Sequence, residues 1–122
     1  MQKSSALALS LALFVAVQST VAAQDQVDVQ LRDDVLAAID RAQQYLISQQ
    51  MGSGAWDTSF TSRYPTGSSA LVLLSLLNSG LPTDHPAVAK SLQNLRSSPD
   101  PDQTYELSML IMALAEVGRQ GK

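Results

Sequence analysis

Two pairs of similar segments constrain the fold of this chain more than any other feature of its sequence. The segment AIDRAQQYLISQQ, from Ala38, aligns with AVAKSLQNLRSSP, from Ala87, at an offset of 49 residues. The segment TGSSALVLLSLLNSG, from Thr66, aligns with TYELSMLIMALAEVG, from Thr104, at an offset of 38 residues. In each repeat an amphipathic segment precedes one that is apolar on most sides. The sequence therefore predicts two αα-hairpins, each an outer helix followed by a more buried inner helix.

Helix boundaries follow from charges, glycines and prolines, and no segment has the alternation of a strand, so we expect an all-α fold. Asp33 and Asp34 suit the N-terminal end of the first helix, where the helix dipole favours negative charge. Gly80 is expected to end the second helix, Asp84 to cap the third, and Gly118 to cap the fourth. The helices are predicted at residues 32–50, 68–78, 84–96 and 104–117.

The two kinds of helix differ in how much of their surface is apolar. The first helix has one apolar stripe, whereas the inner helices need cover on most sides. Met109 and Met112 are expected in the core. Two hairpins alone would leave large apolar faces on both inner helices, so we expect marginal stability or self-association. The stripe of the first helix consists of Val35, Leu36, Ile39, Ala42, Leu46 and Ile47.

The first 23 residues have the three-part layout of a secretory signal peptide. Lys3 precedes an apolar run at residues 6–17, and small residues allow cleavage after Ala23. This run is shorter than the roughly 20 residues that span a bilayer. An N-terminal membrane anchor or a buried core helix is the alternative interpretation. We expect a secreted, periplasmic or cell-envelope protein with no membrane attachment after cleavage, beginning with a flexible polar lead at residues 24–31.

Charge and cysteine content narrow the classes of partner and the sources of stability. The formal net charge of the whole chain is −3, with 8 basic and 11 acidic side chains, so we expect no nucleic-acid partner. The sequence has no cysteine, although small exported domains often rely on disulfides. Stability must therefore come from helix packing, from a partner, or from a longer parent chain.

A spaced motif follows the first helix and contains the only tryptophan of the chain. It consists of Tyr45-Leu46, Gln50, Gly54 and Trp56, in the pattern aromatic-L-x3-Q-x3-G-x-W. At a helix end, a glutamine side chain can bond free backbone groups, and glycine allows a tight turn. The indole N–H can then bond a carbonyl group. We interpret this motif as a structural clasp between the helix end and the following loop.

These residues resemble the QW motif of squalene and oxidosqualene cyclases, which belong to the prenyltransferase and terpenoid-cyclase-like α/α-toroid family. Arg41 matches the basic residue of that motif, whereas Ala42 replaces its usual glycine. The openings of both inner helices are also similar to the family repeat. The resemblance covers residues 35–117 and implies a partial α/α-toroid domain at residues 32–122. Its hairpins, at about residues 32–80 and 84–118, would form an incomplete ring and a fragment of a longer protein.

The resemblance points to three related classes of protein, and the reactive or metal-binding residues of each are missing from this chain. Terpenoid cyclases use a D-x-D-D box as proton donor, whereas this chain has only Asp33-Asp34 and Asp100-x-Asp102. The zinc site of protein prenyltransferases and the thioester of complement-like toroids need cysteine. His85 is the sole histidine, and we expect it in an exposed turn. We therefore predict no catalytic residue, no cofactor and no metal.

A few residues near the mouth of a toroid are candidates for contact with a ligand. Phe60, Arg63 and Tyr64 lie in the long first loop, where aromatic rings could contact a glycan or a lipid. Tyr105 and Glu106 open the second inner helix, where family active-site groups face the cavity. The alternative is that the loop rings fold back on the Trp56 corner.

The leading hypothesis is a secreted, non-catalytic α/α-toroid repeat fragment that acts as a scaffold or binding module. Its partners would be further copies of the chain or the missing repeats of a longer one. A second hypothesis is the remnant or N-terminal part of a terpene-cyclase-like or polysaccharide-acting toroid enzyme. A third is a generic helical-hairpin interaction module, which the 38- and 49-residue offsets disfavour because the tetratricopeptide repeat has about 34 residues.

Overall fold

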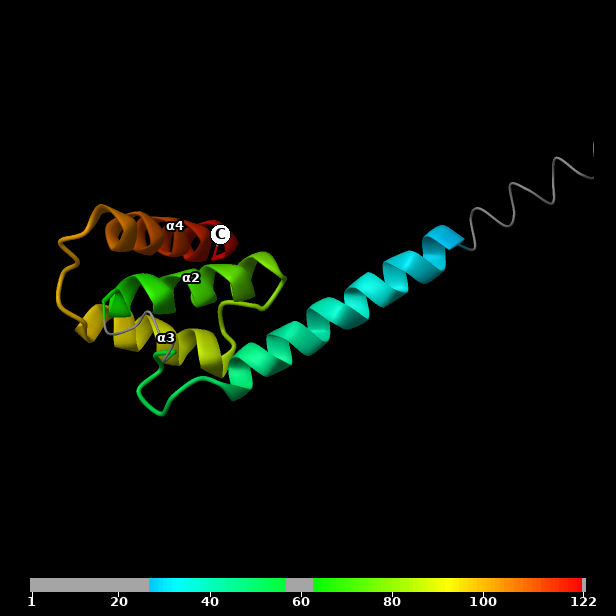
Figure 1. Cartoon of the computed structure of the whole chain (residues 1–122), viewed down its shortest axis with the longest axis horizontal. Coiled ribbons are helices and arrows are strands. Elements are labelled where there is room, and N and C mark those ends of the chain that lie inside the picture. Colours follow the sequence, from blue (N-terminus) through cyan, green and yellow to red (C-terminus); the bar gives the residue numbers. More distant parts are fainter. Residues whose placement is uncertain (1–26, 57–62, 122) are drawn as a thin grey trace, which may run out of the picture. The chain divides into compact units, whose positions relative to one another are not determined.

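The computed structural model describes residues 27–56 and 63–121. Within these two ranges the chain forms helices joined by turns. One isolated antiparallel bridge is present, and no β-strand is formed there. The all-α class predicted from the sequence is therefore confirmed. The helical segments are residues 27–48, α2 (Pro65–Asn78), α3 (Pro86–Ser97) and α4 (Thr104–Gln120) (Figure 1).

The chain divides between Ala38 and Ile39 into two compact units. Residues 27–38 of the first unit are helical throughout, and the predicted signal peptide at residues 1–23 lies outside the described residues. The second unit contains the end of the first helix together with α2, α3 and α4. It therefore holds all the residues of the spaced motif and both inner helices.

The first helix starts earlier than the sequence predicts. Residues 27–31 are already helical, although we expected a polar lead there and a helix that begins near Arg32. No glycine or proline interrupts this stretch, and Gln30 Nε2 donates to Asp34 Oδ1 over 3.1 Å. A polar pair four residues apart stabilises a helix. Asp33 and Asp34 consequently lie inside the helix and not at its N-terminal end.

Helix α2 is the centre of the second unit, because it packs against both α3 and α4 (Figure 1). It begins at Pro65, three residues before the predicted start, since proline fits the first turn of a helix, where its missing N–H is not needed. Leu73, Leu76 and Leu77 of α2 are fully buried. The other members of the buried core are Trp56, Ala70, Leu81, Val88, Leu95 and Ala113.

Helices α2 and α4 run parallel to each other. Glu106, in the first turn of α4, bonds backbone N–H groups in the first turn of α2. At the other end, Gln120 Nε2 donates to the Leu77 carbonyl oxygen over 3.0 Å. Since the starts of the two helices are adjacent and their ends are adjacent, the connecting helix α3 runs in the opposite direction. The inner helices therefore lie side by side in the same direction.

The end of α2 forms as the sequence predicts. Gly80 has φ +97°, a conformation that side chains disfavour, and its N–H donates to the Leu77 carbonyl. The N–H of Leu81 donates to the Leu76 carbonyl, which completes the hydrogen-bond pattern of a Schellman motif. Gln43, on the first helix, donates to the Ser79 carbonyl over 2.8 Å. This corner therefore joins the first helix to the end of α2.

Two predicted helix caps are wrong. The N-cap of α3 is His85 and not Asp84, because Pro86 occupies the first helical position and the residue before it takes the cap. The imidazole Nδ1 of His85 accepts from the Ala87 N–H over 3.1 Å. Gly118 does not cap α4, which continues to Gln120. Side-chain bonds in the last turn of α4 outweigh the low helix propensity of that glycine.

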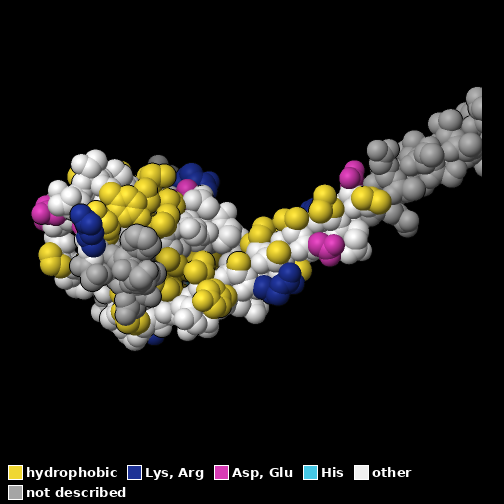
Figure 2. Space-filling model, viewed as in Figure 1, with side chains coloured by type: hydrophobic (Ala, Val, Ile, Leu, Met, Phe, Trp, Pro, Cys, Tyr) yellow, Lys and Arg dark blue, Asp and Glu magenta, His cyan; other side chains and the backbone are white. Residues whose placement is uncertain are grey.

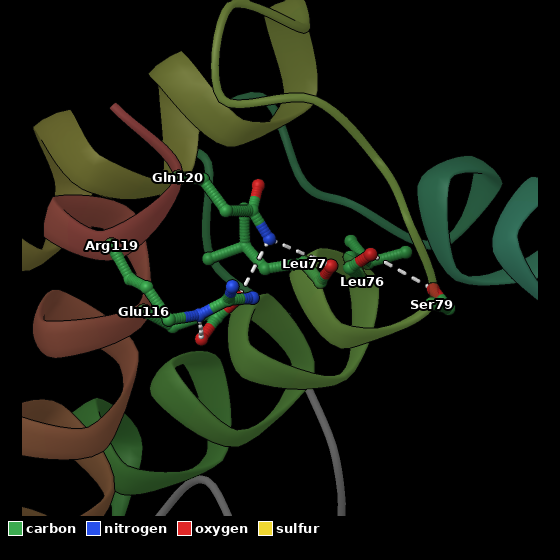
Figure 3. Close-up of polar contacts among 6 residues, drawn as sticks. All are labelled: Leu76, Leu77, Ser79, Glu116, Arg119 and Gln120. Atoms are coloured by element: carbon green, nitrogen blue, oxygen red, sulfur yellow. Dashed lines mark hydrogen bonds and ion pairs between the residues drawn. The ribbon is translucent and has the colours of Figure 1, made fainter. Parts of the chain in front are cut away.

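The last turn of α4 is tied together by three polar side chains (Figure 3). The Glu116 carboxylate accepts from Arg119 Nε over 2.8 Å and also from Arg119 Nη2. Its Oε1 accepts from Gln120 Nε2 over 2.8 Å, and the same amide group reaches the Leu77 carbonyl of α2. The hydrogen bond from Arg119, with that from Gln120, lowers the pKa of Glu116 below its ordinary value of 4.5.

We expect the contribution of Glu116 to stability to depend on pH. Because the pKa is lowered in the folded state, this contribution is fully present above pH 4.5 and is lost as the pH falls through the folded-state value. The Glu116→Gln variant should unfold at a lower temperature than the parent at pH 7, and this gap should shrink toward pH 3. Thermal unfolding followed by circular dichroism measures it. Asp102→Asn, an equal charge change in an exposed turn, is the control, and a gap independent of pH would contradict the assignment.

Candidate functional site

The spaced motif forms a tight turn that brings Trp56 back to the end of the first helix. Gln50 and Trp56 pair as an isolated antiparallel bridge. Inside it, the Met51 N–H donates to the Ala55 carbonyl and the Gly54 N–H donates to the Met51 carbonyl, both over 2.9 Å. The turn is therefore held by its own backbone before any side chain contributes.

The amide group of Gln50 connects this turn to α3. Its Nε2 donates to the Gly54 carbonyl over 3.1 Å and to the Ala87 carbonyl over 2.9 Å. Ala87 lies in the first turn of α3, so one side chain joins the end of the first helix to the start of the next outer helix. Amide donors of this kind fix a position that apolar packing alone would leave loose.

Trp56 bonds both the first helix and α2. Its side chain is buried, and the indole N–H donates to the Leu46 carbonyl in the last helical turn over 2.7 Å. Its backbone N–H donates to Ser69 Oγ of α2 over 3.3 Å. Trp56 therefore connects the first helix to α2. Tyr45, the first residue of the motif, is 64% exposed and lies apart from these contacts.

Gly54 is the position of this turn that no other residue can fill without strain. Its φ is +91°, and a Cβ atom placed there would lie 2.3 Å from the Lys90 carbonyl oxygen. The backbone of the turn thus lies so close to the backbone of α3 that a side chain at this position would collide with it. Gly52, two residues earlier, has no atom within 4 Å of such a Cβ.

Four of the five candidate ligand contacts are described, and three of them lie together near the starts of α2 and α4. The rings of Tyr64 and Tyr105 meet edge to face with centroids 5.4 Å apart. The Arg63 guanidinium lies over the Tyr64 ring at 5.6 Å. Tyr64 thus pairs with Tyr105 of α4, whereas Phe60 lies outside the described residues. Tyr105 is 43% exposed, so part of this cluster faces solvent.

Glu106, the remaining candidate, has a structural role. Its side chain is buried, and Oε1 accepts from the N–H groups of Thr66 and Gly67 over 3.0 and 3.1 Å. These groups lie in the first turn of α2, where N–H groups lack partners in their own helix and the dipole favours negative charge. A Cβ on Gly67 would lie 2.9 Å from Tyr105 Cε1, so this glycine allows the close approach. The carboxylate therefore caps α2 from a different helix.

The remaining ionisable candidates form no site within the described ranges. Asp100 and Asp102 lie in the exposed turn before α4, and His85 caps α3. No group of three or more His, Cys, Asp or Glu side chains in the described part of the chain could hold a metal ion. Among the same residues, no helix is long and apolar enough to cross a membrane.

The most prominent surface feature of the second unit is an apolar face on α4. Figure 2 shows hydrophobic side chains gathered over this helix. Met112 was expected in the core, and this is wrong: its side chain is 51% exposed, because it lies away from the side of α4 that packs on α2. Met109 is partly buried against the core. We call this surface the outward face of α4; its members, with their exposed fractions, are Leu107 (46%), Ile111 (57%), Met112 (51%) and Leu114 (45%).

The sequence predicts an exposed apolar face on both inner helices, and for α2 this is wrong. Leu71, 42% exposed, is the large apolar side chain of α2 that remains open to solvent. The other large apolar side chains of α2 are buried or half-buried, in contact with α3, α4 and Trp56. Among the described elements, α4 packs mainly on α2, and the side chains on its opposite side are exposed.

The Gly54→Ala variant should lower the free energy of unfolding by about 2 to 4 kcal/mol, because it combines backbone strain with a collision against Lys90. Gly52→Ala adds the same methyl group in open space and serves as the matched control. Chemical denaturation followed by circular dichroism compares the two. Equal stabilities of the two variants would show that the turn does not press against α3.

Glu106→Ala should cost about 2 to 3 kcal/mol, since it leaves two buried N–H groups of α2 without an acceptor. Glu106→Gln keeps an acceptor oxygen and should cost about 1 kcal/mol, the value of the lost charge at a helix N-terminus. Denaturation curves of both variants test this order. A loss that is the same for alanine and glutamine would contradict a capping role.

Comparison of the chain with models of protein families, with curated proteins and with solved structures finds no match in any of the three. The resemblance to the QW motif therefore depends on the residues of this chain alone, and its function has to be argued from the geometry of the second unit.

Proposed function

We propose that this chain is an exported, non-catalytic helical-repeat scaffold that binds a protein surface through the outward face of α4. The observation that carries the proposal is the exposure of four large apolar side chains, at 45 to 57%, on one helix. Large exposed apolar patches on soluble proteins commonly mark the sites where other molecules bind. From Leu107 to Ala115 the helix carries no charged residue, so this face suits an apolar partner.

We also propose that the two hairpins are of the α/α-toroid type, similar to the terpenoid-cyclase and prenyltransferase repeat. Two features support this fold. The inner helices α2 and α4 lie side by side in the same direction, as neighbouring inner helices of a ring must. The Gln50 amide joins the end of one outer helix to the start of the next. The Trp56 indole bonds the first helix, and the Trp56 backbone N–H bonds Ser69 of α2.

The proposed location outside the cytoplasm is supported by the layout of the first 23 residues. The absence of cysteine is compatible with an oxidising compartment, because no thiol is exposed to oxidation there. The stability that disulfides would supply then has to come from packing, and contact with a partner on α4 would add to it.

Site-specific photo-crosslinking in the host cell tests this function. A p-benzoylphenylalanine at Leu114 should give covalent protein adducts, whereas the same group at Gln93, exposed on α3, should give several-fold fewer. Electrophoresis and mass spectrometry of the purified chain quantify and identify the adducts. If positions 107, 111 and 114 all give no more adducts than position 93, the outward face of α4 is not a binding surface.

A further inference from the structure

The repeat relates each residue of α2 to the residue 38 positions later in α4. By this relation, Leu73 and Leu76 of α2 correspond to Ile111 and Leu114 of α4. The first two are fully buried, whereas the second two are 57% and 45% exposed. The outward face of α4 is therefore the repeat copy of the face by which α2 joins the core.

On the other side of the two helices, α4 is buried and α2 is exposed. Ala113 of α4 is fully buried, and Met109 packs against the core. Their counterparts in α2, Ser75 and Leu71, are exposed. Helices α2 and α4 thus bury opposite sides of the same repeat unit. At these positions, the residue that one helix exposes corresponds to a residue that the other helix packs against the core.

Helix α3, one of the two helices that pack on α2, has its own repeat counterpart in the chain. Helix α3 contributes Val88, Ser91 and Leu95 to the buried residues of the second unit. The residues 49 positions earlier are Ile39, Ala42 and Leu46 of the first helix, which form part of its apolar stripe. Ile39 is 37% exposed and Ala42 is exposed, whereas Leu46 already packs against the core at one end.

We propose that a second copy of this chain covers the outward face of α4, with its Ile39 and Ala42 packed against Ile111 and Leu114. This inference depends on the proposed function, because it names the occupant of the same surface. The contact would repeat between two chains the packing that α3 and α2 make within one. The chain therefore supplies both the open face and a helix already shaped to fit its repeat copy.

Such a contact joins two different surfaces, so it is heterologous. Each chain that binds through α4 leaves its own first helix free, and each that binds through its first helix leaves its own α4 free. Association by this contact is then directional, and it ends in a closed ring or an open array. An isologous dimer of two α4 faces would leave no such free surface.

The test uses two variants that each remove one of the two surfaces, Ile111→Lys and Ile39→Lys. The chain is expressed with its own N-terminal segment so that the host processes it, and masses are measured by sedimentation velocity and light scattering. The unmodified chain should grow in mass with concentration. Each variant alone should associate at least about tenfold more weakly, as expected when a lysine enters the centre of an apolar contact.

The decisive sample is an equal mixture of the two variants. The intact first helix of Ile111→Lys can bind the intact α4 of Ile39→Lys, so the mixture should form a 1:1 dimer that does not grow further. Met51→Lys, a substitution of an exposed apolar residue in the turn, should associate like the unmodified chain. Circular dichroism of all variants confirms that they are folded.

Three other results would overturn the inference. Association of Ile39→Lys alone that is as strong as that of the unmodified chain would show an isologous contact between two α4 faces. A monomeric unmodified chain, with adducts to a different protein from position 114, would exclude a second copy and leave the proposed function intact. A monomeric chain without adducts would remove both.

Discussion

Helix-terminal backbone groups, bonded by side chains from other elements, determine how the second unit is assembled. Apolar packing is non-directional, and it would allow α2 to slide along its neighbours. The bonds at its ends prevent this, because Glu106 holds the first turn and Gln120 holds the Leu77 carbonyl. Gln50 and Trp56 do the same for the outer helices. The Glu106 carboxylate satisfies N–H groups that α2 cannot satisfy internally. The other bonds add a second donor to a backbone carbonyl, and each of them ties one element to another.

The sequence predicts the order and kinds of helices well, because periodicity and glycines act locally. The all-α class, the Schellman end at Gly80 and the exposure of α4 all follow from such patterns. Contacts between distant residues do not. The cap on α2 comes from Glu106, which lies 40 residues after Thr66 and 39 residues after Gly67. No local sequence signal links residues so far apart. The early start of the first helix was not predicted although its signal is local. A polar stretch without glycine or proline can continue a helix, and residues 27–31 do so.

Among the candidate ligand contacts, Glu106 shows that the position of a residue can be predicted from sequence while its bonding partners cannot. Tyr64, Tyr105 and Glu106 do converge at one end of the inner helices, as residues at the mouth of a toroid would. The carboxylate is nevertheless occupied by two backbone N–H groups, and Gly67 is small so that α4 can approach. An acidic residue at the opening of an inner helix serves here to join two helices. Burial and hydrogen bonding, which only the structure shows, decide between that role and ligand binding.

The glycine beneath this cap makes the two repeats unequal. At the position of Gly67 the second repeat has Tyr105, and at the position of Glu106 the first repeat has Ser68. A further inner helix could therefore not bring a carboxylate against the first turn of α4, since a tyrosine fills the space. Nor does α2 carry a carboxylate to offer. In the described part of the chain this carboxylate cap between parallel helices is made once, so the two repeats, alike in helix order, differ in how each can join a neighbour.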